Sequence, residues 1–85
     1  MAKLSVIVPA YNAETTLRTA VESILSQQVP GLEIIIVNDG STDATDKICH
    51  ALASQNQCIH VITQKNAGIC AARNRGLEAA SGEFL

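Results

Sequence analysis

The hydrophobic positions along the chain change their period several times, and each change predicts a new element. Residues 4–8 (LSVIV) form a short apolar run that closes at Pro9, and because proline cannot donate to a sheet ladder we expect this strand to end there. Residues 33–37 (EIIIV) continue apolar without alternation, which is typical of a strand covered on both faces of a parallel sheet. Residues 58–63 (CIHVIT) alternate more, which favours a strand at the edge of that sheet.

A helical period follows the first apolar run. From Glu14 the apolar residues recur at i, i+3, i+4, i+7 and i+8, with Asn12 as the expected cap and Pro30 and Gly31 as the expected end. The apolar face of this helix would carry Leu17, Ala20, Val21, Ile24 and Leu25.

Two more helices are predicted further along. One runs from about Thr42 to Ser54 and ends near Asn56. Its apolar side would carry Ala44, Ile48, Ala51 and Leu52. The other starts at residues 66–68 and stops at residues 81–82. It carries a narrow stripe of mostly small residues, namely Ile69, Ala72, Gly76, Leu77 and Ala80. Residues 83–85 then begin a fourth strand, so the chain ends inside an element.

The order of elements is strand, helix, strand, helix, strand, helix and the start of a strand. This order implies right-handed crossovers and a parallel sheet. We therefore predict an α/β fold with three layers (α/β/α) around a Rossmann-like sheet. With 85 residues, the chain is at most one small domain, which we expect to be partial.

Composition excludes several classes of protein. A hydrophobic fraction of 47% suffices for a packed core, and a net charge of -2 gives no basic field for nucleic acid or anionic lipid. The three cysteines have no Cys-x-x-Cys spacing, which argues against disulfides and structural zinc and favours a reducing, cytoplasmic location. No apolar run approaches the roughly 20 residues that span a bilayer, so no membrane segment is expected here.

Candidate chemistry begins where the central apolar run stops, at Asp39. Ligands of parallel α/β sheets gather at the carboxyl ends of the strands, so Asp39 occupies the place of a binding residue. Ser41 or Thr42 can cap the following helix, and Asp43 favours its positive end. The alternative is that Asp39 only stabilises the turn, since aspartate is common in turns for local reasons.

The loop after the first strand offers Pro9, Ala10 and Tyr11 beside Asp39. The common dinucleotide and P-loop motifs are missing, but a tyrosine ring could stack on a flat base. A carboxylate could accept the imide N–H of uracil, which the acceptor N3 of cytosine cannot provide, although guanine could also satisfy it. Tyr11 could equally cover the end of the sheet.

Four blocks of sequence together carry a resemblance. They are VIVPAYN at residues 6–12, IVNDGSTD at 36–43, NAG with ARNRG at 66–76, and GEFL at 82–85. In this order they resemble the amino-terminal half of a family 2 inverting glycosyltransferase of the GT-A fold. The resemblance covers nearly the whole chain and implies the strand order 3-2-1-4.

The resemblance implies a role for each matching residue. The base pocket would be lined by Pro9, Ala10 and Tyr11, with Glu14 near the base and ribose. Asp39 would accept a hydrogen bond from the uracil of a UDP-sugar, while Asn66 and Arg73 would approach the nucleotide and its diphosphate.

Physical chemistry agrees with the assignment of Arg73 and adds Gly68 to the site. Arg73 offers a permanent charge and a donor fork suited to phosphate oxygens, against the alternative of a solvated helix face, which we prefer for Arg75. Gly68 would allow close backbone approach at a helix start that favours anions, or would be a plain loop glycine.

The resemblance also implies that the strand beginning at residues 82–85 leads, a few residues later, to an Asp-any-Asp motif that holds Mg²⁺ or Mn²⁺ on the diphosphate. A later half of the protein would supply the acceptor site and the general base. The printed sequence ends before them. We therefore expect no metal bound by these residues and no catalysis by them alone, because glycosyl transfer needs both groups.

Three functions remain open from the sequence. The first is the donor-nucleotide half of an inverting glycosyltransferase. The second is a non-catalytic α/β nucleotide-binding or interaction module that uses the same pocket. The third is another flavodoxin-like fold, which would take FMN or no ligand.

Overall fold

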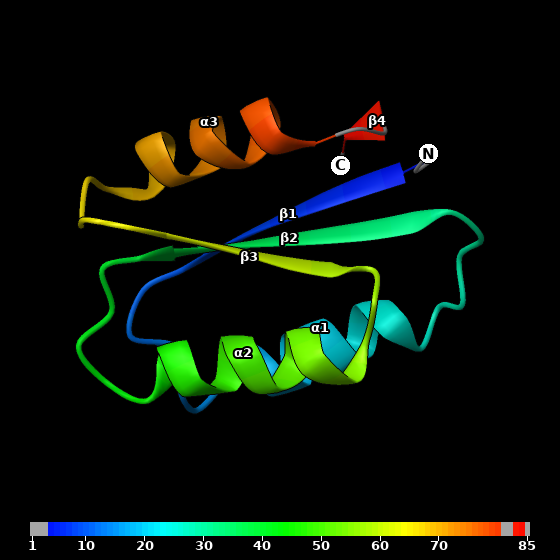
Figure 1. Cartoon of the computed structure of the whole chain (residues 1–85), viewed down its shortest axis with the longest axis horizontal. Coiled ribbons are helices and arrows are strands. Elements are labelled where there is room, and N and C mark those ends of the chain that lie inside the picture. The colour runs from blue at the N-terminus through cyan, green and yellow to red at the C-terminus, as the bar shows by residue number, and fades with distance from the viewer. Residues whose placement is uncertain (1–3, 81–82, 85) are drawn as a thin grey trace.

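The computed structural model describes residues 4–80 and 83–84. Its elements in chain order are β1 (Leu4–Ala10), α1 (Leu17–Leu25), β2 (Leu32–Asp39), α2 (Thr45–Gln55), β3 (Ile59–Gln64), α3 (Ile69–Ala79) and β4 (Glu83–Phe84) (Figure 1). No helix in these ranges is long and apolar enough to cross a membrane.

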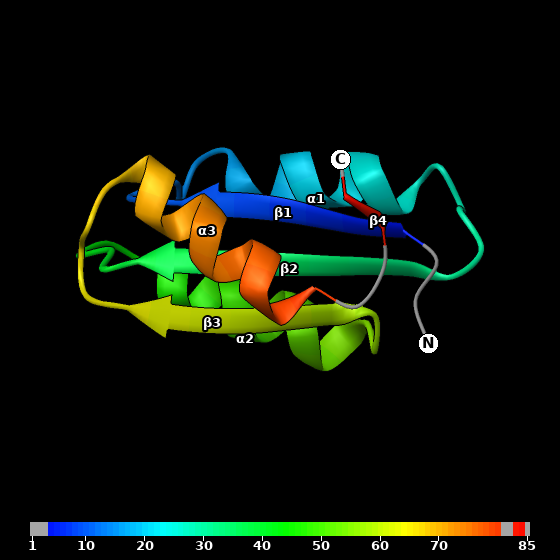
Figure 2. The same ribbon diagram turned by 90° about the horizontal axis from the view of Figure 1, so that it is seen from above.

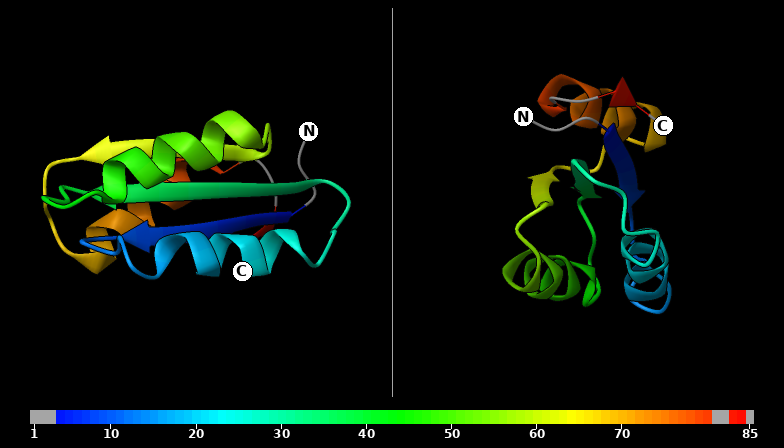
Figure 3. Two further views of the ribbon diagram at one scale, coloured as in Figure 1. Left: turned by 90° about the horizontal axis from the view of Figure 1, so that it is seen from below. Right: turned by 90° about the vertical axis from the view of Figure 1, so that its right-hand side faces the viewer.

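The strands form one parallel sheet in the order β3-β2-β1-β4, with β2 and β1 in the middle. Helices α1 and α2 cover one face and α3 covers the other, which gives three layers (Figures 1 and 3). The predicted fold class, the edge position of β3 and the fourth strand are confirmed.

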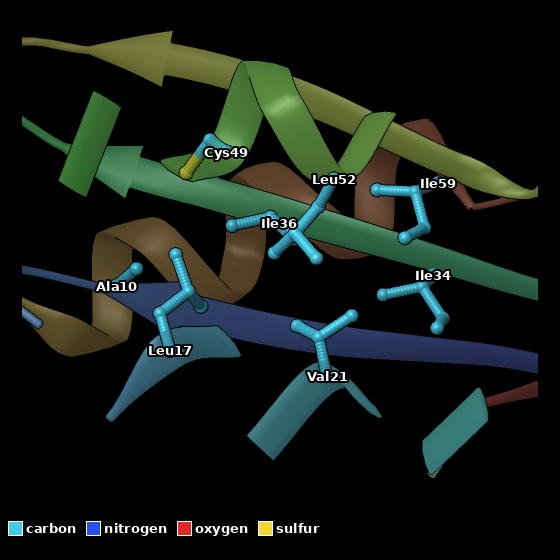
Figure 4. Close-up of a cluster of buried hydrophobic side chains, with 8 residues drawn as sticks. All are labelled: Ala10, Leu17, Val21, Ile34, Ile36, Cys49, Leu52 and Ile59. Atoms are coloured by element: carbon cyan, nitrogen blue, oxygen red, sulfur yellow. The ribbon is translucent and has the colours of Figure 1, made fainter. Parts of the chain in front are cut away.

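The centre of the fold is β2, which is covered on both faces as its unbroken apolar run predicts. Ile34 and Ile36 point toward α1 and α2, where they meet Val21 and Leu52 (Figure 4). All four side chains are at most 1% exposed. The cluster drawn there comprises Ala10, Leu17, Val21, Ile34, Ile36, Cys49, Leu52 and Ile59.

The hydrophobic core on the opposite face of the sheet is smaller, and it lies between the sheet and α3. Ile35 and Val37 pack there against Ala72. Gly76 lets α3 approach so closely that a Cβ atom at this position would lie 2.4 Å from Cγ2 of Ile7. The small-residue stripe is confirmed at Ala72 and Gly76, which are buried, but not at Ile69, which is 63% exposed.

The prediction that β1 ends at Pro9 is wrong. The strand continues through Pro9 to Ala10, with Pro9 opposite Val37 and Ala10 opposite Asn38. On the other side of β1, β4 is paired only with Leu4 and Ser5. A proline is tolerated here because this end of β1 has no described partner on that side, and an edge needs no N–H donor.

Several helix limits also differ from the prediction. Helix α1 starts at Leu17 and ends at Leu25, before Pro30, and Ala20 on its predicted apolar face is exposed. Asn12 does not cap α1. Its φ of 48° is in the left-handed region, and its side-chain oxygen accepts a hydrogen bond from Thr42, which follows β2. Helix α2 starts at Thr45, after the predicted caps. The predicted stop of α3 at residues 81–82, and Leu85, lie outside the described residues.

Candidate functional site

Three loops meet at the carboxyl ends of the parallel strands. They follow β1 (residues 11–16), β2 (residues 40–44) and β3 (residues 65–68), and all lie at the same end of the molecule (Figures 1 and 2). This is the edge at which open α/β sheets bind ligands. The site therefore combines residues that are far apart in the sequence.

A pocket of about 220 Å³ opens at this edge, between the end of β1 and the start of α3. It is lined by Pro9, Ala10, Tyr11, Asp39, Asn66, Gly68, Ile69 and Ala72. Six of the eight site residues expected from the sequence are among them. The lining is apolar with few polar groups, which is typical of a pocket for a small molecule.

Asp39 lines the pocket and is almost fully buried, at 3% exposure. Oδ1 accepts hydrogen bonds from Gln64 Nε2 and from the backbone N–H of Ala67, each at 2.9 Å. Oδ2 accepts from the N–H of Gly68 at 2.9 Å and from Asn66 Nδ2 at 3.4 Å. One carboxylate thus fixes the whole β3–α3 loop, so its turn-stabilising role is real.

These donors also decide the charge of Asp39. The Gln64 amide and the N–H groups of Ala67 and Gly68 lower the pKa of Asp39 below its ordinary value of 3.8, although burial opposes them. Donors that bond the ionised form favour it, so the pocket holds a negative charge at neutral pH.

Asn66 contacts Asp39 through its side-chain amide, and Gly68 contacts it through its backbone N–H. Asn66 Nδ2 donates to the carbonyl oxygen of Asp39 at 3.0 Å, besides its longer contact to the carboxylate. Gly40 must be glycine here, because its φ is 70° and a Cβ atom would lie 2.6 Å from the backbone nitrogen of Asn66. Gly68 has a φ of 94° and stands immediately before α3, so its backbone also requires glycine.

Two assigned residues lie outside the pocket lining. Glu14 is exposed and belongs to the contact between two loops: its Oε2 accepts from the N–H of Ala44 at 3.3 Å, and its own N–H donates to Asp43 at 3.4 Å. In this structure the Glu14 side chain is thus engaged by the β2–α2 loop, and its expected place near the base stays a prediction. Arg73 is exposed on α3 and forms no ion pair within residues 4–80.

Three residues at this site were not expected from the sequence. Gln64 is placed beside Asp39 by the register of β2 and β3, which no local pattern reveals. Ile69 and Ala72 line the pocket from the first turns of α3. For Ile69 a signal existed, since a large apolar side chain directly after a glycine-containing loop at a strand end is well placed to line a ligand pocket.

A divalent metal ion, which the family resemblance implies, does not fit the residues described. No group of three or more His, Cys, Asp or Glu side chains within them could hold one. Asp39 uses its oxygens on protein donors, and Asp43 Oδ1 accepts from the N–H and hydroxyl of Thr45.

With this geometry in view, comparison with known proteins gives the family. Residues 5–85 match the family described as Glycosyl transferase family 2, so the chain belongs to that family. It is 47% identical over 83 residues to the glycosyltransferase GlyA of Streptococcus pneumoniae, covering 98% of this chain and 12% of GlyA.

Two solved structures share the fold. TarS of S. aureus (1–349), in complex with UDP-GlcNAc, has a TM-score of 0.87 at 33% identity over 98% of this chain and 26% of its own. The mannosyltransferase PcManGT of Pyrobaculum calidifontis, in complex with GDP-Man and Mn²⁺, has a TM-score of 0.86 at 26% identity, over 93% and 24%. The chain thus spans about a quarter or less of the length of these proteins. Its fold is that of GT-A glycosyltransferases.

Proposed function

We propose that this chain binds the nucleotide of a UDP-sugar and forms the donor half of an inverting glycosyltransferase. The observation that carries the proposal is the pocket at the strand ends, where Tyr11 and the ionised Asp39 line the same cavity. The solved relative that binds UDP-GlcNAc shares this fold over 98% of the chain, which supports a uridine donor.

In this proposal the base enters the pocket beside the Tyr11 ring. Tyr11 is 53% exposed, so its ring has a face available for stacking. The imide N–H of uracil then donates to Asp39 Oδ2 and replaces the longest contact there, the 3.4 Å approach of Asn66 Nδ2. Ile69 and Ala72 supply the apolar wall opposite Pro9 and Ala10.

The diphosphate lies, in the same proposal, over the amino-terminal turns of α3. Arg73 follows Ile69 by four residues and therefore leaves the helix on the same side as this pocket residue. Helical side chains lean toward the amino terminus, which brings the guanidinium back toward the pocket. A guanidinium matches phosphate oxygens as a bidentate donor.

The complete enzyme would transfer a sugar, with inversion, to an acceptor hydroxyl. The divalent ion and the general base then belong to parts of the protein other than the residues described. The chain alone is proposed to bind a uridine nucleotide weakly and without metal dependence, and to transfer nothing. Its three free cysteines support a reducing, cytoplasmic setting.

The test for base recognition compares UDP with CDP on the wild-type chain and on one variant, Asp39→Asn. The wild-type chain should bind UDP more tightly than CDP by calorimetry, because cytosine N3 has no proton for Asp39. Asp39→Asn keeps the shape of the side chain but adds an amide donor, so it should reduce or reverse this preference. Equal binding of UDP and CDP by the wild type would reject uracil recognition, and tighter GDP binding would show a guanosine donor.

The test for the diphosphate uses a matched pair on one helix. Arg73→Gln should weaken UDP about tenfold, the size of a lost charge-assisted hydrogen bond at an open site, and leave uridine unchanged. Arg75→Gln removes the same charge from the same helix and should change neither. If both variants weakened UDP binding equally, Arg73 would act through the net positive charge of the helix and not through direct contact with the diphosphate.

A further inference from the structure

Among the described residues, six hydrogen bonds join the β1–α1 loop to the β2–α2 loop and to Thr45, the first residue of α2, and all are made by the three residues that follow Tyr11. Asn12 makes three of them: its N–H donates to Ser41 Oγ at 3.0 Å, and its Oδ1 accepts from the N–H of Thr42 at 2.8 Å and from Thr42 Oγ1 at 3.3 Å. The N–H of Ala13 donates to Thr45 Oγ1 at 2.8 Å.

Tyr11 itself has no comparable anchor. Its side chain lines the pocket but forms no hydrogen bond within the described part of the chain, and about half of it is exposed. Its backbone, however, lies between two fixed points. Ala10 is buried and paired opposite Asn38 at the end of β1, and Asn12 is bonded to the neighbouring loop. The direction of the ring therefore depends on these two neighbours.

Asn12 also determines the local path of the chain. Its φ of 48° lies in the left-handed region, where asparagine, aspartate and glycine are favoured over other residues. The chain turns there, directly after Tyr11, and the side-chain oxygen of the same residue bonds across to Thr42. One residue thus combines the turn with the cross-link.

We propose that Asn12 is a positioning residue for Tyr11. By binding Thr42 and Ser41 it holds the β1–α1 loop so that the Tyr11 ring stands at the pocket before a nucleotide arrives. The proposal rests on the uridine-binding function above. Its energetic basis is preorganisation, because a ring already ordered loses less conformational freedom on binding.

The variants separate the backbone from the side chain. Asn12→Gly tolerates the left-handed φ but removes the acceptor, whereas Asn12→Asp keeps both. Ser41→Ala removes the acceptor of the Asn12 N–H from the other loop and should act in the same direction as Asn12→Gly. Ser26→Ala is the matched control, because it removes a single exposed hydroxyl contact, to the carbonyl of Ser23, at the far end of α1.

The sequence contains one tyrosine and no tryptophan, so tyrosine fluorescence reports Tyr11 alone. Tyr11→Phe provides the blank. Without ligand, Asn12→Gly and Ser41→Ala should lose fluorescence anisotropy relative to the wild type, while Asn12→Asp and Ser26→Ala should keep it. Circular dichroism of each variant confirms that the fold is retained.

With UDP, Asn12→Gly should bind about two- to tenfold more weakly, which is the range for ordering one side chain on binding, and Asn12→Asp should restore the affinity. Unchanged anisotropy in both Asn12→Gly and Ser41→Ala would overturn the proposal. Failure of the wild type to bind UDP would instead reject the function, and the anisotropy comparison would still decide how Tyr11 is held.

Discussion

Gln64 lies opposite Asp39 in the register of β2 and β3, and its side-chain amide donates to the Asp39 carboxylate at 2.9 Å. The N–H groups of Ala67 and Gly68 bond the same carboxylate, so a single side chain joins the end of β2 to β3 and to the start of α3. Because all of these partners are donors, the fold stabilises the ionised form.

The first prediction concerns acid stability. The pKa of Asp39 is lowered from 3.8, so its contribution to stability is complete above that value and is lost as the pH falls through 3.8 toward the lower folded-state pKa. Asp39→Asn should be less stable than the wild type at pH 7 and should lose less stability on acidification. Urea unfolding at pH 7, 5, 4 and 3 measures both effects.

The control for this prediction is Glu22→Gln, an exposed carboxylate on α1. It should keep the wild-type dependence on pH. Asp43 contributes in the same direction, since the hydroxyl and N–H of Thr45 lower its pKa, so some acid sensitivity remains in the Asp39 variant. An Asp39→Asn chain with the full wild-type loss would contradict the assignment.

The second prediction concerns the contact between α3 and the sheet. Gly76→Ala places a Cβ atom 2.4 Å from Ile7 Cγ2 and 3.3 Å from Val37 Cγ2. Overpacking of this kind costs roughly 1 to 3 kcal/mol, while the gain in helix propensity returns only about 1 kcal/mol. Gly76→Ala should therefore lower the free energy of unfolding in urea. As a control, Glu78→Ala, at an exposed position of the same helix, should change the free energy of unfolding by less than about 0.5 kcal/mol. A Gly76→Ala chain that is more stable than the wild type would show that α3 is free to move outward.

The third prediction concerns the three free thiols, which differ in burial. Burial, with a smaller contribution from Asp46, raises the pKa of Cys49 to about 11. At pH 8 only about one Cys49 side chain in a thousand is then a thiolate, the reactive form. Iodoacetamide should label the exposed Cys70 first and Cys49 only in urea, as read by mass spectrometry, with Cys70→Ser as the control. Equal labelling of Cys49 and Cys70 in the native chain would contradict the buried position.

The pattern of apolar and polar residues was enough to predict a parallel sheet with the second strand covered on both faces and the third strand at an edge. The unbroken apolar run of β2 requires cover on both faces, and the more polar alternation of β3 suits an edge, so fold class and strand roles followed from local chemistry. Asp39 could be placed at the strand end for the same reason. Its position in a pocket lined by Tyr11 and Asn66 is a consequence of parallel strands ending at one edge.

Other features depend on pairs of residues far apart in the sequence. Asparagine is a residue type that often caps helices, but the side-chain oxygen of Asn12 accepts a hydrogen bond from the N–H of Thr42, 30 residues away, and does not cap α1. Glu14 likewise meets Ala44. The extension of β1 through Pro9 depends on which side of the strand lacks a neighbour. None of these partners is visible in a local pattern.

The last prediction is self-association through the open side of β1. On that side β4 pairs only with Leu4 and Ser5, so residues 6–10 present backbone groups without a described partner. An unpaired, apolar strand edge is a template for another chain, and although Pro9 removes one donor, residues 6–8 remain a continuous apolar segment. We therefore expect sedimentation velocity to show a dimer or larger species as concentration rises from micromolar to millimolar. Amide exchange at residues 6–8 should slow in parallel, because pairing protects those N–H groups, while exchange at the outer edge strand β3, which is more polar, should not change. A single monomer boundary at every concentration would mean that residues 6–10 are protected by other means, and slower exchange in β3 alone would place the contact on the opposite edge of the sheet.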